Sequence, residues 1–380
     1  MAYDKVVDSA SLDSKLTQVA DTIRTKGNTS ADLQFPSGFI SAIQAIQTGT
    51  ELQIIVTVTS GATVTATKGS KVVSGTSVNG TCTLTVPEAG TWSVKATLNG
   101  QTSDTKNVSV VDSYAVTLSF VSAVLNDNDW ATIKTVSDKG EGANYWSIGD
   151  RKEVTLNGTV GHLTLSNYTT YAFIIGFNHN ASVEGANRIH FQLGKTALSG
   201  GKDVCLCDSS YNSTVSTTGY FSMNSSTTNS GGWENSQMRT NICGTSLSSH
   251  SGTIIAVIPE ELRSIIKSVT KYTNNTGNSL DASAVTATTD YFFLLSEYEV
   301  FGSISEANRN ESSKQAQYAY YSAGNSKIKR KYDVTSAVAV WWLRSPRASS
   351  SFSFVNVSTD ETASTNYAYY SFGFAPGFCV

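Results

Sequence analysis

Apolar and polar residues alternate along the chain from Leu52 to about Ser113, and this alternation is the strongest constraint on its fold. Runs with an apolar residue at every second position, such as Ile54, Val56 and Val58, are typical of short strands that bury one face. Three dipeptides that favour tight turns separate the runs: Ser60-Gly61, Asn79-Gly80 and Asn99-Gly100. The stretch therefore predicts a small β-sandwich.

Strand spacing of this kind is typical of immunoglobulin-like domains, which we expect over residues 50–113. Cys82 and Trp92 fall at inward positions of the pattern and are predicted to be core residues. A linker, Asp112 to Asn126, is expected to lead into a third and larger domain over residues 114–380.

Residues 1–49 have a helical pattern instead. Apolar residues recur at steps of three and four, and Gly27 and Asn28 end the first helix. A second helix is expected after Pro36 and before Gly49. The apolar positions of the two helices are Leu12, Leu16, Val19, Ala20, Ile23, Phe39, Ile40, Ile43 and Ile46. Helices this small cannot bury a core alone, so they are predicted to attach the chain to another copy or to a neighbouring protein.

Composition excludes several functional classes for this 380-residue chain. The formal charge of -3 provides no basic face for a nucleic acid. We find neither a signal-peptide pattern nor about 18 consecutive apolar residues, so we expect no classical secretion and no membrane span. The five cysteines are odd in number and scattered, which predicts reduced thiols rather than a disulfide framework.

The large C-terminal part is predicted to be an α+β domain. Asn128 or Asp129 can cap a helix that carries Trp130, Ile133 and Val136, and we prefer this interpretation of the acidic cluster to a calcium site. A second amphipathic helix, led by Pro259, is expected to carry Leu262, Ile265, Ile266 and Val269.

Several landmark motifs in this part resemble those of a bacterial and phage domain family related to C-type lectins and to the formylglycine-generating enzyme fold. They cover about 230 residues and are Tyr145 to Asp150, Phe173 to His179, Gly232 to Ser236, Phe293 to Ser296 with Glu299, and Trp341 to Pro346. Ala20 to Arg24 and Phe35 to Phe39 likewise resemble a short segment of tail proteins from phages of Gram-positive bacteria. In many members of the lectin-like family, a diversity-generating retroelement varies the final segment, and the resemblance implies a variable region at residues 347–372.

The amino acids of this region agree with that implication. Such elements substitute at template adenines, so a varied Asn codon never yields Lys, Gln, Met or Trp. All four are absent from residues 347–372, and Glu361 is the one residue that must be fixed or come from another codon. The predicted ligand-binding residues are Arg347, Ser349, Ser350, Ser351, Phe352, Ser353, Phe354, Asn356, Ser358, Asp360, Ser364, Asn366, Tyr367, Tyr369, Tyr370 and Phe372.

Tyr and Phe give large contact areas for little rotamer entropy, whereas Ser, Thr and Asn adapt their hydrogen bonds. The alternative is that these aromatic residues point inward from amphipathic strands. Val355 and Val357 alternate with Asn356 and Ser358, which predicts one apolar face and one face free to vary. Trp341, Trp342 and the segment Phe374 to Phe378 are predicted to be buried framework.

The cysteines and histidines of the chain do not form a known catalytic motif. Formylglycine-generating relatives use paired cysteines near the C-terminus, where this chain has Cys379, and Cys205, Cys207 and Cys243 are predicted to be core thiols. His162, His179, His190 and His250 lie outside known catalytic motifs, and His179 is expected to be structural. Glu234, Arg239, Glu299 and Arg344 are expected to form buried ion pairs. The chain also lacks the Glu-Pro-Asn, Gln-Pro-Asp and Trp-Asn-Asp triplets of calcium-dependent lectins.

The leading hypothesis is a non-enzymatic receptor-binding protein of a phage or prophage tail, without cofactor or metal. Its variable face is expected to bind a bacterial cell-surface protein or glycan, and residues 1–49 to bind other tail proteins, as a trimer. The expected location is the virion, with the bacterial cell surface as the alternative. A decoration protein with a fixed face and, less favoured, an enzyme of the formylglycine-generating type remain open.

Overall fold

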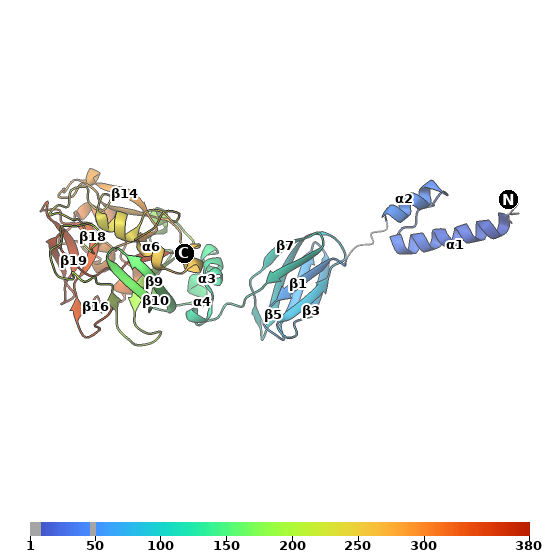
Figure 1. Ribbon diagram of the computed structural model, residues 1–380, viewed down its shortest axis with the longest axis horizontal. Coiled ribbons are helices and arrows are strands. Elements are labelled where there is room, and N and C mark those ends of the chain that lie inside the picture. The colour runs from blue at the N-terminus through green and yellow to red at the C-terminus, as the bar shows by residue number, and fades with distance from the viewer. Residues whose placement is uncertain (1–8, 46–50) are drawn as a thin grey trace. The chain divides into compact units, whose positions relative to one another are not determined.

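The computed structural model describes residues 9–45 and 51–380. The chain, drawn as a ribbon in Figure 1, forms two compact units, one ending at Phe120 and one starting at Val121. Each unit has its own apolar core. As predicted, it is mainly β, with several sheets and short helices. Among the described residues, no helix has the length and hydropathy needed to cross a bilayer.

The N-terminal segment contains the two predicted helices, α1 (Ser9–Gly27) and α2 (Ser37–Ala45). Ala20, Ile23 and Phe39 form a small buried cluster between them. Several other apolar side chains remain exposed in this chain: Leu12, Val19, Phe35, Ile40 and Ile43. Ile46 and Gly49 lie outside the described residues.

The sandwich consists of two sheets, with strand orders β4-β1-β8 and β3-β2-β5-β6, and β7 pairs with β5. Its strands are β1 (Gln53–Thr57), β2 (Thr63–Lys68), β3 (Lys71–Thr76), β4 (Thr81–Thr85), β5 (Gly90–Leu98), β6 (Gln101–Thr102), β7 (Lys106–Val110) and β8 (Ser113–Thr117). The alternating apolar residues of both sheets face one core, which includes Cys82 and Trp92 as predicted. Asn79 and Gly80 have φ values of 52° and 82°, the left-handed conformation that a tight hairpin turn requires.

The prediction that the linker begins at Asp112 is wrong, because residues 113–117 form strand β8. Strand β8 pairs in parallel with β1, and Leu118 is buried in the sandwich core. The sequence pattern is weak there because every residue of β8 is exposed or half-buried. The sandwich therefore extends beyond residue 113.

The C-terminal unit is built on a five-stranded sheet of order β15-β21-β11-β10-β9, with smaller sheets β12-β16-β17, β13-β14 and β18-β19-β20. The strands are β9 (Arg151–Val160), β10 (Leu163–Phe177), β11 (Ile189–Lys195), β12 (Val204–Cys205), β13 (Val269–Asn274), β14 (Val285–Asp290), β15 (Phe292–Phe293), β16 (Lys329–Lys331), β17 (Val338–Ala339), β18 (Trp341–Pro346), β19 (Ser353–Val357), β20 (Ala363–Tyr367) and β21 (Gly377–Cys379). Strand β21 lies between β11 and β15, so the chain's last residues belong to the core sheet.

Short helices fill the connections of this unit. They are η1 (Leu125–Asp127), α3 (Trp130–Asp138), α4 (Gly142–Tyr145), α5 (Ala181–Glu184), η2 (Met238–Cys243), α6 (Ile254–Val257), α7 (Glu260–Arg263), η3 (Ala282–Ala284), α8 (Glu297–Phe301), η4 (Arg309–Ser313) and α9 (Ala319–Ser322). The Asp129 carboxylate accepts a hydrogen bond from the Thr132 amide at 2.7 Å, so the predicted cap of α3 is confirmed.

The prediction of a long helix after Pro259 is wrong. Helix α7 ends at Arg263, and Val269 begins β13. Leu262, Ile265 and Ile266 are nevertheless buried, so their helical spacing reflects burial in the core rather than a continuous helix. Pairing of β13 with all of β14 replaces the helical hydrogen bonds.

Candidate functional site

The predicted variable region forms the end of the sheet β18-β19-β20 and the loops around it. Strand β18 carries the Trp341 to Pro346 motif and pairs with β19, which in turn pairs with β20. Every side chain of β18 and β19 is buried, whereas β20 is an edge strand with half-buried to exposed side chains. The accessible part of residues 347–372 is therefore β20 with the adjoining loops.

Four of the sixteen predicted contact residues are buried, so the prediction of their exposure is wrong. They are Ser353, Phe354, Asn356 and Phe372. The alternation of Val355 and Val357 with polar residues predicted one free face, but β19 is the central strand and both of its faces are covered. Phe374 and Phe378 are fully buried, as predicted.

The remaining twelve predicted residues reach the surface to different degrees. Phe352 and Tyr367 are about half exposed, at 50% and 47%. The others are exposed or half-buried: Arg347, Ser349, Ser350, Ser351, Ser358, Asp360, Ser364, Asn366, Tyr369 and Tyr370. They belong to the loop before β19, the turn before β20, and β20 with the residues after it.

Four aromatic rings of this region stack in a row. The centroid of Tyr369 lies 5.8 Å from that of Tyr367 and 5.5 Å from that of Tyr370. Tyr370 stacks in turn on the buried ring of Phe372, with centroids 5.7 Å apart. The row therefore leads from solvent to the core, and its inner end restrains the outer rings. We call Tyr367, Tyr369 and Tyr370 the tyrosine face.

Residues outside the predicted variable region hold this surface in place. Asn229 is fully buried, and its Nδ2 donates to the carbonyl oxygens of Arg347, Ser350 and Ser353 at 3.1, 2.7 and 2.9 Å. One side chain thereby fixes the loop before β19. No sequence motif marks Asn229, so its role could not be predicted from the sequence.

Glu361 has a structural role that sets it apart from its neighbours. Its carboxylate accepts hydrogen bonds from the Ser326 hydroxyl at 2.8 Å and from the Lys327 amide at 3.0 Å. These bonds lower the pKa of Glu361, the amide bond most strongly. The one residue that does not fit the codon pattern thus ties the turn before β20 to another loop.

A hollow of about 380 Å³ lies beside Tyr369. Its other walls are Thr214, Val215 and Ser216 on one segment, and residues 225–227 on another. The Val215 amide donates to the Tyr369 carbonyl at 3.0 Å, and the Asn224 amide donates to the Ala368 carbonyl at 2.9 Å. Backbone hydrogen bonds therefore connect the segments of Val215 and Asn224 to Tyr369 and Ala368 in the predicted variable region.

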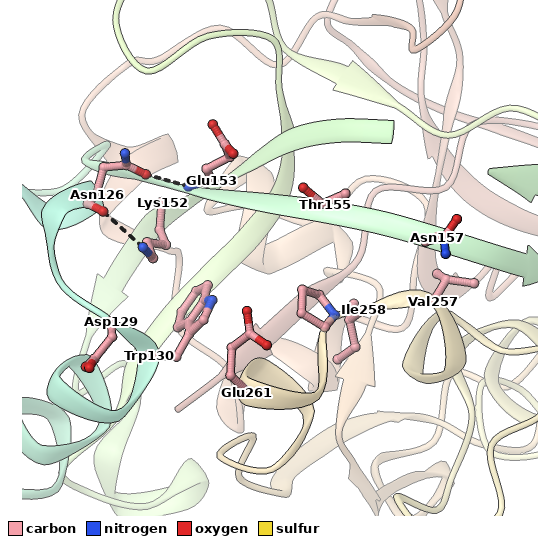
Figure 2. Close-up of a pocket in the computed structure, with 11 residues that line it drawn as sticks. Asn126, Asp129, Trp130, Lys152, Glu153, Thr155, Asn157, Val257, Ile258 and Glu261 are labelled. Carbon is pink, nitrogen blue, oxygen red and sulfur yellow. Dashed lines mark hydrogen bonds between the residues drawn. The ribbon is translucent and has the colours of Figure 1, made fainter. Parts of the chain in front are cut away.

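A larger hollow, of about 670 Å³, lies elsewhere in the C-terminal unit (Figure 2). Several of its polar groups already have partners in the protein. The Asn126 carbonyl accepts from Lys152 at 2.9 Å, the Asn126 side chain accepts from the Glu153 amide at 2.8 Å, and Asp129 caps α3. Because these groups are engaged, this hollow is the weaker candidate.

Beneath β18 lies a buried ionic cluster centred on Glu299. Arg344 binds Glu299 through both terminal nitrogens, and its Nε donates to Thr273 at 2.8 Å. Lys271 donates to Glu299 at 2.9 Å and to Glu184 at 2.6 Å. Burial alone would raise the pKa of Glu299, but the charges of Arg344 and Lys271 lower it. The two cations and two carboxylates thus compensate one another.

The predicted ion pairs are confirmed for Glu299 with Arg344. Arg239 pairs instead with Asp290, at 2.6 Å, and meets Glu234 through the latter's carbonyl. The sequence missed Lys271, because a lysine in a strand is ordinarily exposed. Its inward position between buried Val269 and Thr273 is the signal that could have identified it.

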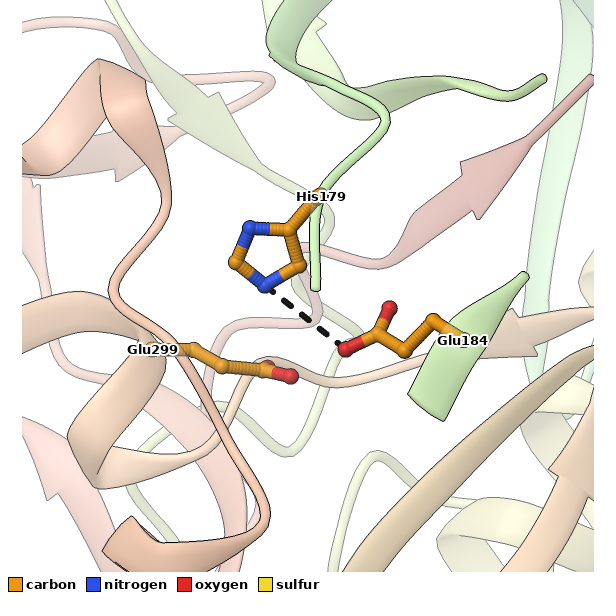
Figure 3. Close-up of side chains that lie close together, drawn as sticks. All are labelled: His179, Glu184 and Glu299. Atoms are coloured by element: carbon orange, nitrogen blue, oxygen red, sulfur yellow. Dashed lines mark ion pairs between the residues drawn. The ribbon is translucent and has the colours of Figure 1, made fainter. Parts of the chain in front are cut away.

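His179, Glu184 and Glu299 could in principle hold a metal ion, because one ligand atom from each lies within 4.8 Å of the others. Figure 3 shows His179 and Glu184 facing each other, with Nε2 and Oε1 3.6 Å apart. The Lys271 ammonium, however, already bridges the two carboxylates. A divalent cation would have to displace that charge, so the arrangement fits a structural ion-pair network better than a metal centre.

The thiols have no environment that would activate them. All five cysteines are buried and free. The hydrogen bond between the Cys207 and Cys205 thiols, together with burial, raises the pKa of Cys207, and burial raises the pKa of Cys243 and Cys379. A nucleophilic thiol requires a lowered pKa and access to substrate. These cysteines therefore act as core residues, as predicted.

Residues 210–380 match the model of a family described as a domain of unknown function, DUF6273. The match includes both the segments around the hollow beside Tyr369 and the entire tyrosine face. No curated protein gives a significant match to the chain.

Proposed function

We propose that the chain is a non-enzymatic recognition protein that binds its target through the tyrosine face and the loops around it. The observation that carries this proposal is the row of stacked rings, whose outer members reach solvent while Phe372 is anchored in the core. Large rings that are already restrained lose little entropy on binding, which is why such residues dominate paratopes.

The framework of this face supports the proposal that its side chains vary. Tyr369 and Ala368 are held by backbone hydrogen bonds, and the loop before β19 is held through its carbonyl oxygens. A side-chain substitution leaves such bonds in place. We infer that residues 347–372 are diversified by a retroelement at exposed positions, while the buried ones stay constant.

We further propose that the C-terminal unit is a C-type-lectin-like domain of the formylglycine-generating-enzyme type. Support comes from the landmark residues Trp341, Trp342 and Arg344, which are fully buried at its centre. The sandwich fits an immunoglobulin-like domain, because two sheets enclose one core around Trp92.

The proposed setting is a phage or prophage tail, in which the target is a protein or glycan of the bacterial surface. The exposed apolar residues of α1 and α2 support attachment of this segment to other tail proteins or to further copies, for which we propose a trimer. Display on a bacterial cell is the alternative location. A fixed decoration protein is the alternative function, and a formylglycine-generating type of enzyme is less favoured because the thiols are buried.

Adsorption of the purified protein to a panel of bacterial strains tests the binding function. The variant Phe352→Ser, Tyr369→Ser, Tyr370→Ser is expected to fold normally and to lose adsorption to any strain that the wild type binds. The matched control is Tyr145→Ser, which removes a tyrosine that is 40% exposed outside residues 347–372 and should adsorb like the wild type. Unchanged adsorption of the triple variant would favour the decoration protein.

A further inference from the structure

The hollow beside Tyr369 combines one aromatic side chain with a set of free hydroxyl groups. Five hydroxyl side chains line it: Thr214, Ser216, Ser225, Ser226 and Thr227. Among the described residues, these side-chain hydroxyls make no hydrogen bond to another protein group, and four of them are exposed. Each hydroxyl can both donate and accept a hydrogen bond, so they can bind a ligand that is rich in the same groups.

Charge narrows the class of ligand. The remaining lining residues are Val215 and Tyr369, so no ionisable Asp, Glu, Lys, Arg or His side chain lines the hollow. A phosphate-rich or sulfated polymer would need cationic partners, and a basic peptide would need carboxylates. A neutral ligand with many hydroxyl groups and an apolar C–H face fits both the hydroxyl wall and the tyrosine ring. The volume of the hollow, about 380 Å³, falls within the range of about 300–1,000 Å³ for small-ligand sites.

We propose that this hollow is a calcium-independent binding site for a neutral glycan, an inference that rests on the proposed recognition function. The hydroxyl wall lies outside residues 347–372 and Tyr369 lies inside them. The wall is therefore constant and provides affinity for sugars as a class, whereas the residue at position 369 selects among them. The Val215 to Tyr369 backbone hydrogen bond keeps the two walls together whichever side chain stands at 369.

The test is binding of the whole protein, with EDTA present, to an array of neutral, sialylated and sulfated oligosaccharides. The wild type is expected to bind a subset of the neutral glycans. Ser225→Ala, Ser226→Ala, Thr227→Val should lower that binding about tenfold or more, because up to three hydrogen bonds are lost. Tyr369→Ser should change which neutral glycans bind. Thr217→Val, an exposed hydroxyl residue beside the hollow, is the matched control and should bind like the wild type.

No binding to neutral glycans, binding that EDTA abolishes, or equal binding by the hydroxyl-wall variant would each overturn this inference. Cell adsorption separates that result from failure of the recognition function. If protease treatment of the cells abolishes adsorption and periodate does not, the target is a protein; the tyrosine face would remain a binding surface while the glycan inference fails. If the tyrosine-face variant adsorbs like the wild type, the recognition function itself fails.

Discussion

Arg344 is a single buried residue that stabilises the sheet carrying the tyrosine face. It is fully buried in β18, where it neutralises Glu299 and donates to the Leu294 carbonyl at 2.9 Å. Removing one partner of a buried pair leaves the other charge without compensation. The motif that contains Arg344 could be recognised in the sequence, and the inward position of Lys271 in β13 could have indicated its burial. That both cations neutralise Glu299 could not be predicted, because charge compensation depends on residues far apart in the chain.

Arg344→Met is therefore expected to lower the free energy of unfolding by about 3–5 kcal/mol. Arg347→Met is the matched control, because Arg347 pairs with Glu306 at 3.0 Å near the surface and should cost about 0–1 kcal/mol. Urea unfolding followed by tryptophan fluorescence measures both. Equal costs for the two variants would contradict the proposed role of the buried cluster.

The buried titratable groups act on stability in opposite directions. Burial and the Lys271 charge lower the pKa of His179 to about 3, so its contribution is present above pH 6.5 and is lost as pH falls toward 3. Burial raises the pKa of Glu184 and of Glu311 to about 7, so their contribution is present below pH 4.5 and is lost as pH rises through 7. The two effects oppose each other between pH 4.5 and 6.5.

His179→Phe removes the contribution of His179 to the pH dependence of stability. The phenyl ring can keep the stack on Tyr318, whose ring centroid lies 3.7 Å from that of His179. Relative to the wild type, the variant should gain roughly 2 kcal/mol of stability between pH 7 and pH 4.5. Urea midpoints at the two pH values measure this difference. The same difference between variant and wild type at both pH values would show that folding does not lower the pKa of His179.

At the scale of elements, the sandwich could be predicted well because each inner strand buries one face. The alternation of Ile54 and Val56 follows directly from that arrangement. Strand β19 could not be assigned in this way, since β18 and β20 flank it and other parts of the unit cover both of its faces. Tertiary packing thus decides which residues of β19 are buried. Phe354 and Asn356 are predicted to be exposed but are buried.

The loop before β19 provides a prediction at this scale. Asn229→Ala should leave three carbonyl oxygens without their donor, cost about 1–3 kcal/mol, and speed hydrogen exchange of residues 347–353. Adsorption should fall although no residue of the binding face has changed. Asn241→Ala, at an exposed asparagine in the same family-matched region, is the control. Unchanged exchange in residues 347–353 would rule out Asn229 as the residue that fixes this loop.

At the scale of the molecule, sequence patterns predicted which parts of the chain are helical and which are β, but not the residue at which the sandwich ends. Helical spacing before residue 50 and alternation after it identified two kinds of structure, whereas β8 was hidden because its side chains lie near the surface. The separate cores of the two units agree with a chain in which one part can vary its surface without disturbing the other. We propose that this variation occurs at the exposed positions of residues 347–372.

Sequencing the DNA that encodes Trp341 to Val380 across a large population derived from one clone tests that claim most directly. A near-repeat of this DNA and a reverse-transcriptase gene are expected nearby, and changes should fall at template adenines in codons for exposed residues such as Phe352, Tyr367 and Tyr369. The codons for Phe354, Phe372 and Glu361 should stay constant. A population without changes, or with changes as frequent at Phe354 and Phe372 as at the tyrosine face, would contradict the account.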